Sequence, residues 1–142
     1  TDAMVDWEDK LKHDHIQAKR MLHFLGEFYG LSLYETVFFQ RLIMATLAEE
    51  ILALRPELKI RRSGDDLFLG DRKLSVSIVT ASPVSTLLHI GLNIDPTGAP
   101  VAAVGLAEWD ISPSKLARAA LQRESTEFES IFMAGTKVQA RF

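Results

Sequence analysis

The chain has 142 residues, of which 47% are apolar and 25% charged, a balance typical of a soluble globular protein. Its length predicts one domain over residues 1–142. The net charge of −3 and the lack of a long basic stretch exclude an evident nucleic-acid surface. The absence of cysteine excludes disulfides, thiolate metal sites and cysteine nucleophiles.

Two further features set expectations about location. No apolar run reaches the roughly 18 residues that a membrane helix needs, and no signal peptide is evident. We therefore expect a cytoplasmic protein without a membrane partner. The chain begins with Thr1 rather than methionine, so either the start is processed or an N-terminal segment is missing.

The first 15 residues are polar and predict a loop. Asp6, Glu8 and Asp9 form an acidic cluster within it, and His13 and His15 flank an aspartate. Either group could hold a cation, because carboxylates and imidazoles are common metal ligands. A solvated loop is the preferred interpretation of both, so no metal site is predicted.

A strand and a helix follow. Residues 21–29 are aromatic and apolar and predict a strand, or the end of a loop that leads into one. Ser32 and Glu35, three positions apart, form a capping box, which predicts a helix over about residues 33–54. Pro56 ends this helix, because proline disfavours a helical conformation in the preceding residue.

The middle of the chain predicts a sheet. Short extended segments are separated by turns such as 70–72, and short connections favour antiparallel neighbours. The predicted strands cover residues 58–62, 66–69, 73–81 and 86–94.

The last third begins with a turn at residues 95–98. Residues 101–106 predict a short strand or a bend. Ser112 and Pro113 predict a helix start, and this helix is expected to end near residue 133, before Gly135. Residues 136–142 are expected to form a final strand. Together the elements predict an α+β fold, with a mostly antiparallel sheet packed on helices.

Side-chain alternation along two neighbouring predicted strands separates an aliphatic face from a face of small and polar groups. We expect the aliphatic face to pack on a helix. Small residues leave room for a ligand, and a lone lysine could pair with phosphate or carboxylate. Exposure of this second face to water remains the alternative. Its members are Lys73, Ser75, Ser77, Leu87, His89, Gly91 and Asn93.

Specific motifs add to this pattern. The segment SGDDLFLGDRKLSVSI resembles the part of biotin and lipoate protein ligases written W-P-N-D-[IL], a hairpin, and K-[IL]-x-G-I. Asp66 falls on the motif's aspartate and Lys73 on its lysine. LLHIGLNI resembles the following I-G-x-G-[IL]-N-[VI] strand and places Asn93 on its asparagine. The resemblance covers residues 31–95. More narrowly, GDDLFLGDRKLSVSIVTASPVS is similar to an uncharacterised, mostly archaeal family distantly related to these ligases.

The resemblance implies a class II aminoacyl-tRNA synthetase/biotin synthetase-like fold, on which a carboxylic acid and ATP, with Mg²⁺, condense to an acyl-adenylate. Lys73 would contact the carboxyl and phosphate region as the catalytic residue. Asp66 would help to hold metal or orient the nucleotide, and Asn93 would line the pocket or contact the nucleotide. The predicted ligand-binding residues are Asp65, Asp66, Ser75, His89, Gly91 and Asn93.

The chain departs from the ligase pattern at several positions. Ser63 and Gly64 replace the motif's Trp-Pro, Asp65 replaces its asparagine, and no Gly/Arg-rich loop of the kind that closes over the acyl-adenylate is present. The alternative is therefore a non-catalytic domain on the same scaffold that binds a small-molecule ligand or forms a homodimer.

Overall fold

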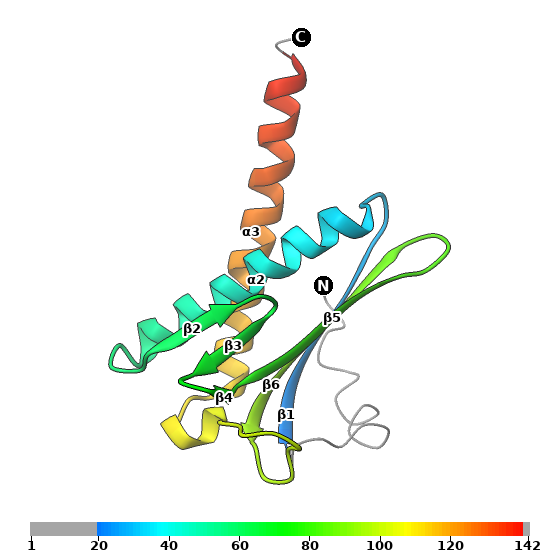
Figure 1. Ribbon diagram of the computed structural model, residues 1–142. Coiled ribbons are helices and arrows are strands. Elements are labelled where there is room, and N and C mark those ends of the chain that lie inside the picture. The colour runs from blue at the N-terminus through cyan, green and yellow to red at the C-terminus, as the bar shows by residue number, and fades with distance from the viewer. Residues whose placement is uncertain (1–19, 141–142) are drawn as a thin grey trace.

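The computed structural model describes residues 20–140, with side chains for residues 20–136 (Figure 1). The loop predicted over residues 1–15, including its acidic cluster and its two histidines, lies outside this range. The strands are β1 (Arg20–Phe28), β2 (Ile60–Ser63), β3 (Asp66–Leu69), β4 (Arg72–Lys73), β5 (Ser75–Ala81) and β6 (Thr86–Asp95). The helices are α2 (Leu33–Leu54), the short 3₁₀ helix η1 (Leu106–Trp109) and α3 (Pro113–Ala140).

The strands of the described region form two antiparallel three-stranded sheets, with the orders β1-β6-β5 and β2-β3-β4. Helices α2 and α3 lie on the same side of the β1-β6-β5 sheet (Figure 1). The predicted α+β class with antiparallel strands is confirmed. None of the helices described is long and apolar enough to cross a membrane.

Helix α2 begins with the predicted capping box. The Ser32 hydroxyl accepts a hydrogen bond from the Glu35 N–H at 3.1 Å, and the Glu35 carboxylate accepts one from the Ser32 N–H at 2.7 Å. The second bond lowers the pKa of the Glu35 carboxyl. The helix ends at Leu54, as Pro56 predicts, and Arg55 then donates from Nε to the Trp109 carbonyl at 2.8 Å. This contact ties the end of α2 to the segment before α3.

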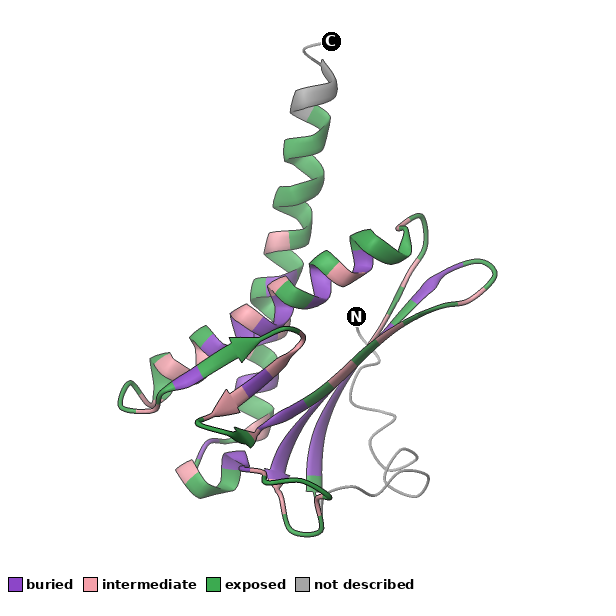
Figure 2. Cartoon of the chain, viewed as in Figure 1, coloured by how far each residue is buried: buried purple, intermediate pink, exposed green. Residues whose placement is uncertain are grey.

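One hydrophobic core lies between the helices and the β1-β6-β5 sheet. Buried side chains from α2, such as Met44 and Leu47, meet Ile90 and Leu92 of β6. Figure 2 shows that burial is concentrated at this contact, whereas the outer half of α3 is exposed. Helix α2 contributes nine buried residues.

The structure corrects two predictions for single elements. The strand predicted over residues 73–81 is divided, because β4 ends at Lys73 and β5 starts at Ser75. The helix predicted to end near residue 133 continues through Gly135 to Ala140, so the final strand predicted over residues 136–142 is wrong at least to Ala140. A lone glycine inside a helix costs only about 1 kcal/mol, and Gly135 does not adopt the positive φ of a helix-ending glycine.

Residues 101–106, predicted as a short strand or a bend, form no extended strand. Ala103 makes one isolated parallel bridge with Lys73, and η1 begins at Leu106. This segment therefore lies beside the point where the two sheets meet.

Candidate functional site

The two sheets join at Leu74, the single residue between β4 and β5. Its N–H donates to the Leu67 carbonyl of β3 at 2.9 Å, while its carbonyl accepts from the Asn93 N–H of β6 at 2.8 Å. Leu74 is fully buried. The junction thus brings the ends of β3, β4, β5 and β6 together.

Three polar side chains meet at this junction. The Lys73 ammonium lies 3.0 Å from Oδ2 of Asp66, and the Ser75 hydroxyl donates to Oδ1 of Asp66 at 2.8 Å. Ser75 also accepts from the Leu67 N–H at 2.9 Å. The Asp66 side chain is 14% exposed and that of Lys73 is 32% exposed. We call Asp66, Lys73 and Ser75 the junction cluster.

The junction cluster fixes the Lys73 ammonium at a defined place on the protein surface. Both Asp66 oxygens accept hydrogen bonds or pair with a charge, so the carboxylate is fixed on two sides. The ammonium carries three N–H donors, and one direction is taken by Asp66. Lys73 can therefore direct its other donors toward an anionic ligand.

Tight turns at either end of β3 set the spacing of this cluster. Gly64 and Gly70 have φ values of 62° and 63°, in the left-handed region that glycine adopts at little cost. The β3–β4 hairpin, with Gly70 in its turn, returns the chain so that Asp66 and Lys73, seven positions apart in sequence, become close neighbours.

Asn93 contacts the main chain of Lys73. Its side-chain amide donates to the Lys73 carbonyl at 3.2 Å and to the Val104 carbonyl at 3.1 Å. The Lys73 N–H donates to Ala102, and its carbonyl also accepts from the Val104 N–H. Asn93 is 7% exposed, and its described contacts are those of a residue that positions Lys73.

Asp65 lies in the turn before β3 and is half-buried. Its main-chain carbonyl accepts from the Ser77 hydroxyl at 2.6 Å. Ser77 in turn accepts from the Gln40 amide of α2 at 2.9 Å. These bonds connect the β2–β3 turn, β5 and α2.

The predicted single face of small and polar side chains is wrong. Antiparallel partners share a face, and Ser75 and Ser77 pair with Leu92 and Ile90. The two serines therefore point toward the helices, while Val76 and Ile78 share the opposite face with Gly91 and His89. The two serine hydroxyls can be placed on the core side because they form hydrogen bonds with Leu67, Asp65 and Gln40.

His89 and Gly91 lie on that opposite face and do not join the cluster. His89 Nε2 is 2.8 Å from Nδ1 of His23 on β1, and the two rings stack. A Cβ built on Gly91 would lie 2.8 Å from Cε of Met21 and 3.2 Å from the Val76 side chain. The space above Gly91 is thus filled by protein, not open to a ligand.

Sequence reasoning did not reveal the partners of these side chains. The pairing of His23 with His89 and the contact of Gln40 with Ser77 join residues more than 35 positions apart. Glu124, which is buried on α3 without a hydrogen-bond partner among the described residues, was also missed. Its only sequence signal is a carboxylate on the same helix side as Leu116, Ala117 and Ala120.

Comparison with known proteins identifies the chain's relatives. A family model described as "Domain of unknown function (DUF366)" matches residues 1–139. The chain belongs to the DUF366 family. The DUF366 chain is 30% identical over 97 residues to the uncharacterized protein MJ0805 of Methanocaldococcus jannaschii, an alignment that covers 68% of this chain and 43% of the relative. The match thus spans less than half of that relative's length.

Three solved structures illustrate what the DUF366 chain is similar to in fold. A protein of unknown function from Pyrococcus horikoshi has a TM-score of 0.75 at 34% identity, covering 94% of this chain and 72% of that one. The biotin protein ligase of Aquifex aeolicus in complex with biotin and ATP has a TM-score of 0.59 at 15% identity, covering 86% and 66%. Protein Ta0514 of T. acidophilum, with bound lipoic acid, has 0.56 at 16%, covering 89% and 63%. The fold is therefore biotin/lipoate ligase-like.

Proposed function

We propose that the junction cluster binds a nucleotide or an acyl-adenylate and activates a carboxylic acid with ATP. The observation that carries this proposal is the Lys73–Asp66 pair, in which a partly exposed ammonium is held 3.0 Å from a mostly buried carboxylate. The motif resemblance assigns the same lysine to the charged region of an acyl-adenylating site. The ligase-like fold supports the proposal as analogy.

The reaction would join a carboxylate oxygen of the acid to the α-phosphorus of ATP. The bond from that phosphorus to the bridging oxygen would break, and pyrophosphate would leave with the electron pair. Negative charge gathers on the phosphoryl oxygens in the transition state. A preoriented ammonium such as that of Lys73 would stabilise this charge.

The described residues do not supply a metal site of their own. No group of three or more His, Asp or Glu side chains in residues 20–136 is arranged to hold a metal ion. Both Asp66 oxygens are already engaged by Lys73 and Ser75. Asp66 therefore fits the role of orienting Lys73 better than that of a metal ligand, and Mg²⁺ would arrive on the nucleotide phosphates.

ATP–pyrophosphate exchange, measured on the full-length protein with a panel of carboxylic acids, tests the proposal. Lys73→Ala should lower exchange by about 10²–10³-fold, the effect of removing one preorganised electrostatic donor. Lys59→Ala, which removes an exposed lysine before β2, is the matched control and should leave the rate unchanged. Thermal melts would confirm that both variants fold.

The absence of exchange with every acid, together with no thermal shift on adding ATP, would rule out this function. Lys73→Arg separates charge from geometry. Arginine keeps the positive charge but not the compact ammonium, so we expect partial activity. Full activity of Lys73→Ala would contradict the role of the lysine.

A second candidate is a non-catalytic interaction domain that forms a homodimer. Large apolar side chains are exposed on three elements, with Phe38 of α2 at 74%, Phe132 of α3 at 69% and Val84 of the β5–β6 turn at 74%. Exposed apolar patches commonly mark interaction surfaces. Light scattering and native mass spectrometry would test this candidate, and a monomer that retains no ligand would count against it.

A further inference from the structure

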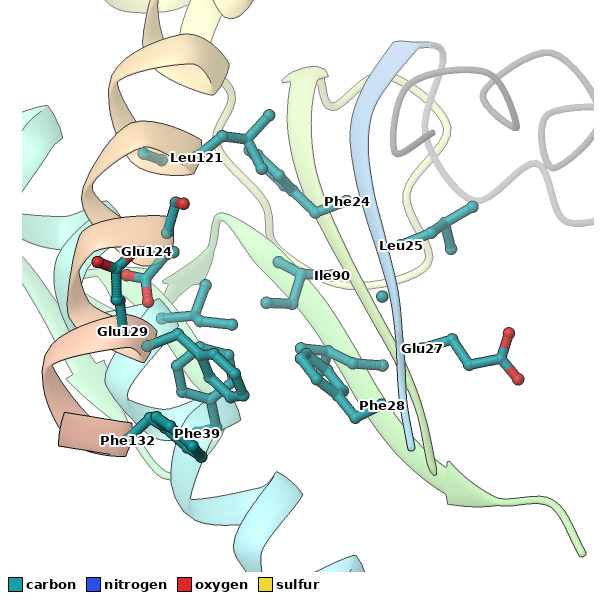
Figure 3. Close-up of a pocket in the computed structure, with 16 residues that line it drawn as sticks. Phe24, Leu25, Glu27, Phe28, Phe39, Ile90, Leu121, Glu124, Glu129 and Phe132 are labelled. Atoms are coloured by element: carbon teal, nitrogen blue, oxygen red, sulfur yellow. The ribbon is translucent and has the colours of Figure 1, made fainter. Parts of the chain in front are cut away.

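A cavity of about 450 Å³ lies between α3 and strands β1 and β6, and no residue of the junction cluster lines it (Figure 3). In Figure 3, Phe24 and Ile90 point from the strands toward α3, whereas Leu25 and Glu27 point away. Protein interiors are close-packed and contain few voids larger than a water molecule, whereas pockets that hold small molecules have volumes of roughly 300–1,000 Å³. The cavity therefore has the size of a small-molecule site.

Aromatic rings from three elements form much of the cavity wall. Phe28 of β1 and Phe39 of α2 meet edge to face, with ring centroids 5.5 Å apart. The ring centroid of Phe128 of α3 lies 5.3 Å from that of Phe39 and 6.2 Å from that of Phe28. Phe132, one turn further along α3, is mostly exposed at the edge of the cavity. A hydrocarbon in the cavity would remove apolar surface of these rings from water, which is the main favourable contribution to most association.

Glu124 is buried in this wall and presents no polar atom to a ligand. Both of its carboxylate oxygens expose less than 1 Å² of surface, so only the hydrocarbon part of the side chain can line the cavity. Burial raises the pKa of this carboxyl, and the interaction with the Thr46 hydroxyl of α2 opposes the rise in part. Burial thus favours the neutral form, and Glu124 contributes hydrocarbon to the cavity surface.

The charges around the cavity disfavour an anionic ligand. No Lys, Arg or His is among the described residues that line it, whereas Glu129 borders it and is exposed. Arg123, on the same helix, is held by Glu49 at 2.7 Å and by Glu50 at 3.1 Å. A carboxylate or phosphate in the cavity would therefore be repelled by Glu129, without a compensating cation from the described walls.

The size of the cavity fits a small molecule better than a helix of a partner protein. An α-helix with its side chains is about 10–12 Å across and has a pitch of 5.4 Å, so one turn occupies roughly 400–600 Å³. The cavity would hold a single turn. A cavity of roughly 150 Å³ lined by Leu, Ile and Phe binds benzene, so one with three times this volume can enclose a body of about eight to ten carbon atoms.

We propose that this cavity binds an uncharged small molecule with an aliphatic or aromatic body, which packs between the phenylalanine rings of β1, α2 and α3. The ligand class follows from three properties of the cavity. The walls require apolar surface, the acidic border disfavours an anion, and the volume is that of a small molecule. This site is separate from the junction cluster and does not depend on its activity.

Calorimetry with n-hexanol, n-heptanol, n-octanol and octanoate on the full-length protein at pH 7 tests the proposal. Each methylene that enters the cavity should tighten binding of the alcohols by about fourfold. Octanoate has the chain length of n-octanol but carries a charge, and it should bind at least about fivefold more weakly. Glu129→Gln should narrow this difference, while Glu57→Gln, which removes an exposed carboxylate outside the cavity, should retain it.

Substitutions on α3 locate the binding site. Ser125 is exposed and borders the cavity, so Ser125→Trp should fold and weaken n-octanol binding. Ser130→Trp, at an exposed position of the same helix outside the cavity, is the matched control and should bind as the wild type does. Phe128→Ala removes one ring of the wall from a side chain that is already 40% exposed, so this variant should also fold and bind n-octanol more weakly.

Three results would overturn the proposal. The first is an affinity that does not rise from n-hexanol to n-octanol, or n-octanol that does not bind. The second is octanoate that binds as tightly as n-octanol, or an unchanged n-octanol affinity in both Ser125→Trp and Phe128→Ala. The third is a dimer that covers the cavity, detected as self-association that excludes n-octanol and that Phe132→Asp abolishes.

Discussion

At the scale of single residues, Asn93 shows how one side chain can hold two chain segments in place. Asn93→Ala removes the donor to the Lys73 and Val104 carbonyls and should destabilise the protein by about 1–3 kcal/mol. Asn93→Asp should cost more, because an ionised carboxylate would face two carbonyl oxygens. Urea denaturation measures both effects. Thr80→Ala, at an exposed position of β5, is the control, and wild-type stability of Asn93→Ala would refute this role.

Glu124 gives a pH-dependent prediction. Because burial raises its pKa, the folded state binds a proton more tightly than the unfolded state. Protonation of Glu124 therefore stabilises the folded state fully below the ordinary glutamate pKa. This stabilisation is lost as the pH rises through the raised pKa of the folded state. Glu124→Gln does not titrate, so its melting temperature should exceed that of the wild type by an amount that grows from about pH 4 to pH 7. A difference that stays constant with pH, as expected for Glu57→Gln, would contradict this.

At the scale of elements, two glycines with opposite surroundings can be compared. A Cβ on Gly105 would overlap the Ile94 carbonyl oxygen and lie 2.8 Å from its carbon. Because backbone cannot easily move aside, Gly105→Ala should destabilise the protein by about 1–3 kcal/mol. A Cβ on Gly135 would meet nothing within 4 Å, so Gly135→Ala in α3 should stabilise by about 0.5–1 kcal/mol. Chemical denaturation of the pair tests this, and equal effects would disprove the difference in packing.

The elements also show where sequence patterns suffice and where they fail. The capping box at Ser32 and the proline after Arg55 define α2 correctly, because both signals act within a few residues. The break at Leu74 is not visible in sequence, since it depends on Leu67 and Asn93 hydrogen-bonding to the same residue from two different strands. Likewise, α3 continues beyond Gly135, because a glycine ends a helix only where its backbone adopts a positive φ, and Gly135 does not.

At the scale of the whole molecule, motif spacing placed Asp66 and Lys73 together and Asn93 beside them. Side-chain alternation, by contrast, assigned Ser75 to the wrong face, because it does not reveal that Ser75 pairs with Leu92 of β6. It gave His89 and Gly91 a common site with Lys73, although their described neighbours come from β1 and β5. The fold class was therefore predictable from local patterns and resemblance. The separation of His89 and Gly91 from Lys73 was not predictable, because it depends on the pairing of strands that are distant in sequence.

The way in which Lys73 is attached to the fold makes its role open to experiment. Its peptide N–H and carbonyl bond Ala102, Val104 and Asn93, whereas its ammonium pairs with Asp66. The architecture at this position is thus encoded in main-chain atoms that every residue except proline supplies in full. Side chains at position 73 can be exchanged across charge, length and shape with the junction of the sheets left in place, so chemistry and folding can be varied independently there.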